Sequence, residues 1–100
     1  MKGNSFLFKA KIWLYEGAAA WHFVTLPSPL AKTIQEFFAT YKKGWGSIPV
    51  QVTVSQANWK TSIFPDKKSQ SYLLPLKSDV RKKLKVGVGD EIKVVIEILV

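Results

Sequence analysis

The chain has 100 residues, of which 47% are hydrophobic, and its formal net charge at pH 7 is +8. This length and apolar content suit one domain whose core needs neither a disulfide nor a metal to fold. The absence of cysteine excludes disulfides, thiolate zinc sites, iron–sulfur clusters and cysteine nucleophiles. We predict a single domain over residues 1–100 and assign it no cofactor and no metal site.

No stretch of the sequence has the hydrophobic length of a signal peptide or of a membrane helix. The apolar residues 6–8 near the start are followed at once by Lys9 and Lys11, whereas a membrane helix needs about 20 consecutive apolar residues. The sequence therefore favours a cytoplasmic protein without a membrane partner.

Two strands and a long helix are predicted in the first half of the chain. Residues 5–16 alternate between apolar and mostly polar or aromatic positions, which is typical of a half-buried strand. The predicted inner face of this strand comprises Phe6, Phe8, Ala10, Ile12 and Leu14. Residues 21–26 form the second strand. Ser28 and Pro29, followed by apolar residues at helical spacing, predict an amphipathic helix over about residues 29–43.

Four strands and a short helix are predicted in the second half. The strands are residues 47–55, 58–64, 71–76 and 91–99. The first of them alternates, with Ile48, Val50, Val52 and Val54 on the inner face. The last places Ile92, Val94, Ile96 and Ile98 on one face. Ser78 is the predicted cap of a short helix over residues 78–84.

These elements predict an all-β fold. Six short strands of regular length, accompanied by one long and one short helix, favour a small closed six-stranded barrel. Closure is favoured because it removes the unpaired strand edges that an open sheet exposes.

Several motifs follow one another along the chain in a recognisable order. They are FLFKAKIWL at 6–14, TLP at 25–27, GSIPVQV at 46–52, WKTSIFP at 59–65, YLLPLK at 72–77, VR at 80–81 and GDEIKV at 89–94. In this order they resemble the bacterial family known as domain of unknown function 1905. The resemblance covers almost the whole chain and implies a small closed β-barrel with a helix packed at one end. It implies no activity, cofactor or catalytic residue. Glycines expected in the turn 55–58 and in the loop 67–71 are absent here.

Residues 74–92 are also similar to swapped-hairpin DNA-binding regulators of the transition-state-regulator and antitoxin type. Both have a strand, a short helix, a Gly-Asp turn and a second strand. We favour shared turn geometry as the explanation, since Gly89 permits the turn backbone and Asp90 can accept bonds from N–H groups of its own turn.

The richest cluster of candidate ligand-binding residues lies on two predicted neighbouring strands and the segment after them. It comprises Trp59, Lys60, Thr61, Ser62, Tyr72, Lys77 and Arg81. An aromatic plane, hydroxyl groups and positive charge suit an anionic ligand with a flat group, such as a nucleotide or a single-stranded base. The alternative, which we favour, is that Trp59 and Tyr72 are core residues, because buried aromatics are usual in a small core.

A second candidate is a basic patch on a loop and the short helix. It comprises Lys67, Lys68, Lys82, Lys83 and Lys85. A run of this kind is most often a solvated face. Arg81 is the only arginine among the 15 basic residues, and this argues against specific base reading, which uses arginine heavily.

An enzyme is the least favoured class. Nothing in the sequence links the single histidine, His22, to a nucleophile or a carboxylate, and Asp90 and Glu91 would point to opposite faces of a strand. We predict a small binding or interaction module for an anionic small molecule or a protein partner. The alternative is a sequence-tolerant nucleic-acid-binding protein, which the net charge of +8 favours.

Overall fold

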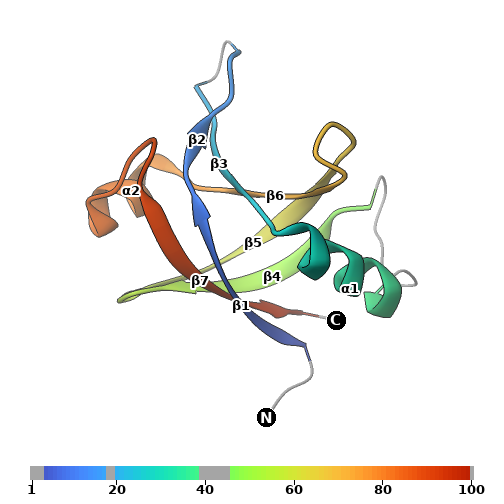
Figure 1. Ribbon diagram of the computed structural model, residues 1–100. Helices are drawn as coiled ribbons and strands as arrows, with labels where there is room; N and C mark the ends of the chain where they lie inside the picture. Colours follow the sequence, from blue (N-terminus) through green and yellow to red (C-terminus); the bar gives the residue numbers. More distant parts are fainter. Residues whose placement is uncertain (1–3, 18–19, 39–45, 100) are drawn as a thin grey trace.

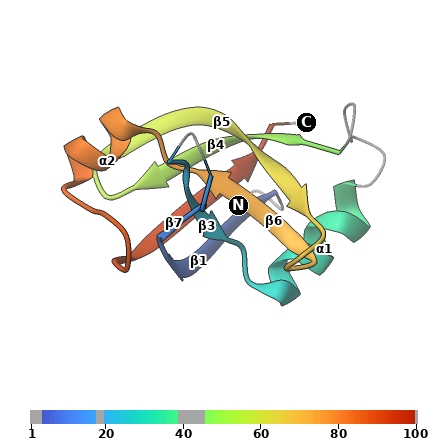
Figure 2. The same ribbon diagram turned by 90° about the horizontal axis from the view of Figure 1, so that it is seen from above.

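A computed structural model describes residues 4–17, 20–38 and 46–99 of the chain (Figure 1). In this part of the chain, seven antiparallel strands form one curled sheet, and the two helices lie at its opposite ends (Figures 1 and 2). The elements are β1 (Ser5–Lys11), β2 (Trp13–Leu14), β3 (His22–Thr25), α1 (Ser28–Phe38), β4 (Ile48–Val54), β5 (Ala57–Asp66), β6 (Ser71–Pro75), α2 (Ser78–Leu84) and β7 (Glu91–Ile98). The prediction of an all-β fold is confirmed.

The strands follow the order β1-β7-β4-β5-β6-β3-β2 across the sheet. The long strand β5 connects its two parts. Residues 57–63 of β5 pair with β4, whereas residues 64–66 pair with β6. Because β5 pairs with β4 along one half and with β6 along the other, the sheet curls on itself (Figure 2). The curled sheet has a concave inner face and a convex outer face.

The sheet is an open half-barrel, so the predicted closed six-stranded barrel is wrong. The long first strand is interrupted at Ile12, whose N–H donates to the carbonyl of Asp90 (2.9 Å) and whose carbonyl accepts from the N–H of Gly89 (2.8 Å). As a result β1 pairs with β7, and β2 pairs with β3. Among the described residues no ladder joins β1 to β3, and β1 and β2 are the two edges of the sheet.

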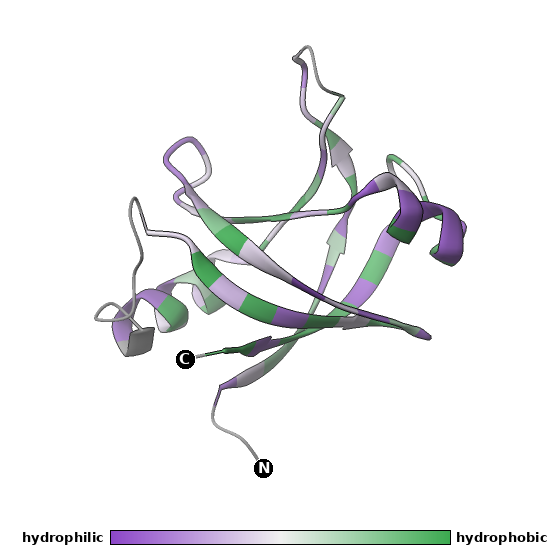
Figure 3. Ribbon diagram, turned by 180° about the vertical axis from the view of Figure 1, so that it is seen from behind, coloured by the Kyte–Doolittle hydropathy of each residue, from purple (hydrophilic) through white to green (hydrophobic). Residues whose placement is uncertain are grey.

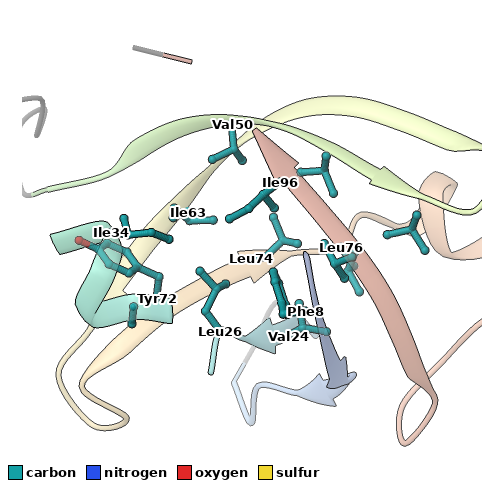
Figure 4. Packing of buried hydrophobic residues seen from close by; sticks show 14 of the residues in the cluster. Phe8, Val24, Leu26, Ile34, Val50, Ile63, Tyr72, Leu74, Leu76 and Ile96 are labelled. Atoms are coloured by element: carbon teal, nitrogen blue, oxygen red, sulfur yellow. The ribbon is translucent and has the colours of Figure 1, made fainter. Parts of the chain in front are cut away.

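The inner face of the sheet holds the hydrophobic core. Every second residue of β4 and β7 is buried, which confirms the alternation predicted for both strands. Val50, Leu74 and Ile96 are completely buried and converge in the centre of the molecule (Figure 4). Of the predicted inner face of the first strand, Ile12 is buried, but Leu14 is 43% exposed because it lies beyond the interruption.

The two helices differ in how they meet the core. The helix α1 begins at Ser28, and its apolar residues Ala31 and Ile34 are buried. Ile34 points into the core (Figure 4). Residues 39–43 of the predicted long helix lie outside the described residues. The helix α2 has the predicted bounds, but its N-cap is Lys77, not Ser78, and the Lys77 side chain makes no capping bond. None of the residues of α2 is buried, and the helix is mostly hydrophilic (Figure 3).

Two turns that lack the expected glycines adopt left-handed backbone nonetheless. Ser55, in the two-residue turn between β4 and β5, has φ 53°, and Gln70, before β6, has φ 54°. The Asp66 carboxylate accepts bonds from the N–H and the hydroxyl of Ser69. The turn therefore starts after Asp66, and β5 extends two residues beyond the predicted end at Phe64.

Candidate functional site: a surface around Trp21

Aromatic side chains gather on the outer face of the sheet formed by β2, β3, β6 and β5. Trp13 lies opposite Phe23, and Phe64 lies opposite Leu73 in the ladders. Directly opposed residues point to the same face of a sheet. Val24 and Leu74, the next residues along the same strands, are buried on the inner face. Phe23 and Leu73, and the residues opposite them, therefore face outward. We define the aromatic face as Trp13, Tyr15, Trp21, Phe23 and Phe64.

The rings of the β2–β3 hairpin pack against one another. The Phe23 ring centroid lies 5.4 Å from that of Trp13, 6.3 Å from that of Tyr15 and 5.8 Å from that of Trp21. Trp21 is stacked on Phe23 and Tyr15 meets it edge-on, the two geometries that aromatic pairs prefer. Tyr15 and Trp21 remain 51% and 50% exposed. The hairpin therefore presents ordered aromatic surface outside the core.

Two neighbouring open hollows share Trp21, Pro75 and Lys77. The Lys60 hollow, of about 440 Å³, is lined in addition by Lys60, Thr61, Ser62 and Phe64. The Arg81 hollow, of about 360 Å³, is lined in addition by Ala20, His22, Leu76, Ser78 and Arg81. Both hollows combine the Trp21 ring with positively charged side chains.

A third hollow adjoins these two and is apolar. The aromatic hollow, of about 330 Å³, is lined by Tyr15, Trp21, Phe23, Phe64 and Leu73. It shares Trp21 with both of the other hollows and Phe64 with the Lys60 hollow. The Trp21 ring is thus common to all three.

Five of the seven predicted ligand-binding residues line these hollows. Lys60, Thr61 and Ser62 meet Lys77 in the Lys60 hollow, and Lys77 meets Arg81 in the Arg81 hollow. The Arg81 side chain is anchored, because its Nε–H donates to the carbonyl of Leu76 at 3.1 Å. An anchored guanidinium loses less freedom when it binds an anion than a free one does.

Trp59 and Tyr72 do not line the three hollows; Tyr72 belongs to the core, and Trp59 packs against it. Tyr72 is 1% exposed and its ring lies beside Ile34 of α1 (Figure 4). Trp59 is half-buried and packs against the core. Successive residues of a strand point to opposite faces, so Trp59 points inward where Lys60 points outward. Burial raises the pKa of the Tyr72 hydroxyl from its ordinary value of 10.0.

The aromatic rings that line the Lys60 hollow are those of Trp21 and Phe64, not that of Trp59. The signal for Phe64 is present in the sequence, because Lys60, Ser62 and Phe64 are spaced by two and must share one face of a strand. No sequence pattern indicates that Trp21 lies beside these residues. It reaches the other residues only through the pairing of β3 with β6 and of β6 with β5.

The predicted basic patch is divided in the structure. Lys82, Lys83 and Lys85 are exposed on α2 and directly after it, whereas Lys67 and Lys68 are exposed in the turn between β5 and β6. The turn with Lys67 and Lys68 lies at the start of β6, and α2 lies after the end of β6. The length of β6 therefore separates these two lysines from the lysines of α2 (Figures 1 and 2). The five lysines therefore do not form one continuous surface.

The described residues contain no group of three or more His, Asp and Glu side chains arranged to hold a metal ion. The His22 Nδ1 lies 3.0 Å from the carbonyl oxygen of Ala20, so the ring contacts its own hairpin. None of the described helices has the length and apolar character that crossing a lipid bilayer requires.

The chain was compared with families of known proteins. A family model described as "Domain of unknown function (DUF1905)" matches residues 8–96. The matched range includes the whole aromatic face and every residue that lines the three hollows. Among curated proteins, no sequence matches the chain.

Proposed function

The chain belongs to the DUF1905 family, whose description states no activity, and we propose from the site that it binds a small anionic ligand with a flat ring. One observation carries this proposal. The half-exposed Trp21 ring borders two hollows that also contain Lys60, Lys77 and Arg81. Aromatic surface and positive charge thus lie within the reach of one small molecule.

The two chemical features have separate roles. A planar ring of the ligand stacks on Trp21, which is possible because half of this side chain is accessible. A phosphate or carboxylate of the ligand lies between Lys60, Lys77 and Arg81, where charge-assisted hydrogen bonds are stronger than neutral ones. A nucleoside monophosphate carries both groups.

Adenosine monophosphate is therefore the first probe. Adenosine and inorganic phosphate, its two halves, are tested separately. Isothermal titration calorimetry should show that the whole nucleotide binds more tightly than either half. Trp21→Ala and Lys77→Gln should each weaken binding of the nucleotide about tenfold, since each removes about one stacking or ionic contact.

Lys93→Gln is the matched control for the lysine variant, because Lys93 is exposed on β7 and lines none of the three hollows around Trp21. It should leave the affinity unchanged. The proposal fails if adenosine monophosphate does not bind, or if Lys77→Gln and Lys93→Gln weaken binding equally.

A further inference from the structure

We propose that the natural ligand of this surface is a short single-stranded nucleic acid. This inference rests on the proposed function and extends it, because the surface does not end at the two charged hollows. The aromatic hollow continues it from Trp21 and Phe64 to Phe23 and Tyr15, and no charged side chain lines that hollow. An isolated nucleotide has no second base to occupy this additional apolar space.

The aromatic face matches what successive bases require. A single strand presents unstacked bases that stack on protein rings, and this contact tolerates any sequence because every base has a flat face. Trp21 and Tyr15, both half-exposed, lie on the two arms of the hairpin, and both contact the same ring, Phe23. One base at Trp21 and a second in the aromatic hollow would therefore be neighbours.

The charges indicate where the backbone of the strand runs. Lys60, Lys77 and Arg81 border Trp21 on the side of α2. Beyond Tyr15, a larger hollow of about 640 Å³ is lined by Glu16 and Asp66 as well as Lys68. The two carboxylates repel phosphates there, so the bound segment ends near Tyr15 and is short.

Double-stranded nucleic acid does not fit this surface. In a duplex the flat faces of the bases are covered by their neighbours, and proteins that read its grooves rely on arginine. The chain has one arginine, Arg81. The aromatic face would have no contact to make with a duplex.

Fluorescence anisotropy with labelled oligo(dT) and oligo(U) of about ten nucleotides tests the inference, with thymidine monophosphate as competitor. Either oligonucleotide should bind at least tenfold more tightly than the mononucleotide, and the tighter of the two identifies DNA or RNA as the source. The affinity should fall with salt with a log–log slope of about −2, which corresponds to about three cations on a single strand.

Tyr15→Ala separates the inference from the proposed function. Tyr15 is 51% exposed and lies outside both charged hollows, so its removal should weaken oligonucleotide binding about tenfold and leave mononucleotide binding unchanged. Val88→Ala, which truncates a side chain that is 56% exposed and lines none of the three hollows, is the control. Circular dichroism melts of both variants establish that they are folded.

Several results would overturn the inference. They are an oligonucleotide affinity no better than that of the mononucleotide, a flat salt response, equal binding of a duplex or of a polyglutamate peptide, and an unchanged affinity in Tyr15→Ala. If the mononucleotide still binds in a manner that depends on Trp21, the proposed function stands and only its extension to a strand is lost.

Discussion

The β4–β7 pair and the β3–β6 pair are built alike on the inside and differently on the outside. Both are antiparallel, and both bury aliphatic side chains such as Val94 in β7 and Leu74 in β6. Outside, β4 and β7 carry mainly polar residues, whereas β3 and its hairpin carry stacked rings. Core formation explains both inner faces but not the exposed rings. The inner faces therefore stabilise the fold, whereas the exposed rings of the hairpin need another explanation.

The largest expected effect is on the inner face of β7. Ile96→Ala should lower the free energy of unfolding by about 3 kcal/mol, because it leaves a cavity in a completely buried position. The neighbouring Val95 is 38% exposed, and Val95→Ala should cost less than about 1 kcal/mol. Urea unfolding measures both values. Equal losses would contradict the division into an inner and an outer face.

The next effect distinguishes two tryptophans on opposite faces. Trp59→Ala should lower the free energy of unfolding by about 2 kcal/mol, because Trp59 packs against the core. Trp21→Ala should cost about 1 kcal/mol or less, because half of Trp21 is exposed. The same urea titrations apply. If Trp21→Ala proves the more destabilising, the exposed rings of the hairpin stabilise the fold, and the distinction between the two faces is wrong.

A smaller effect is expected at the one buried polar residue among those that the structure describes, Ser71 in β6. Its hydroxyl donates to the carbonyl of Leu26 at 2.7 Å. Ser71→Ala should cost about 1 kcal/mol, because the buried carbonyl loses its donor. Thermal melts compared with Ser5→Ala, an exposed position on β1, measure the difference. An equal stability of the two variants would show that this bond contributes nothing.

The smallest effect concerns pH and Tyr72. The folded protein holds this hydroxyl proton more tightly than the unfolded chain does, since burial raises its pKa above 10.0. The stability contributed by the neutral hydroxyl is therefore complete below about pH 10 and is lost as the pH rises through the folded pKa. Between neutral and strongly alkaline pH, the free energy of unfolding of the Tyr72→Phe variant should fall less than that of the wild type. Tyr15→Phe, at an exposed ring, should follow the wild type.

Local patterns were sufficient for most of the fold. Strict alternation identified β4 and β7, and the bounds predicted for α2 are those observed. The turn before β7 is also local, since the carboxylate of Asp90 accepts from the N–H of Gly87 at 2.8 Å and Gly89 has φ 91°. These features depend on residues a few positions apart, and their chemistry is therefore readable from the sequence.

The predicted fold is wrong at the first strand, residues 5–16, because its two halves pair with different strands. Alternation continues without interruption from Lys11 to Trp13, so the sequence contains no mark of the break at Ile12. The break exists because β7 and its preceding turn bond one side of this region while β3 bonds the next residues. The same break opens the predicted barrel and leaves Leu14 exposed.

The sequence by itself determined the all-β class, the inner faces of β4 and β7 and the cations of the candidate site. It also required Trp59 and Lys60 to face opposite sides, since side chains alternate along a strand. Only the tertiary structure decided which ring accompanies those cations. Trp21 meets Lys60 and Lys77 across three strands, and pairing between distant segments is set by the packing of the whole sheet, which no local pattern records.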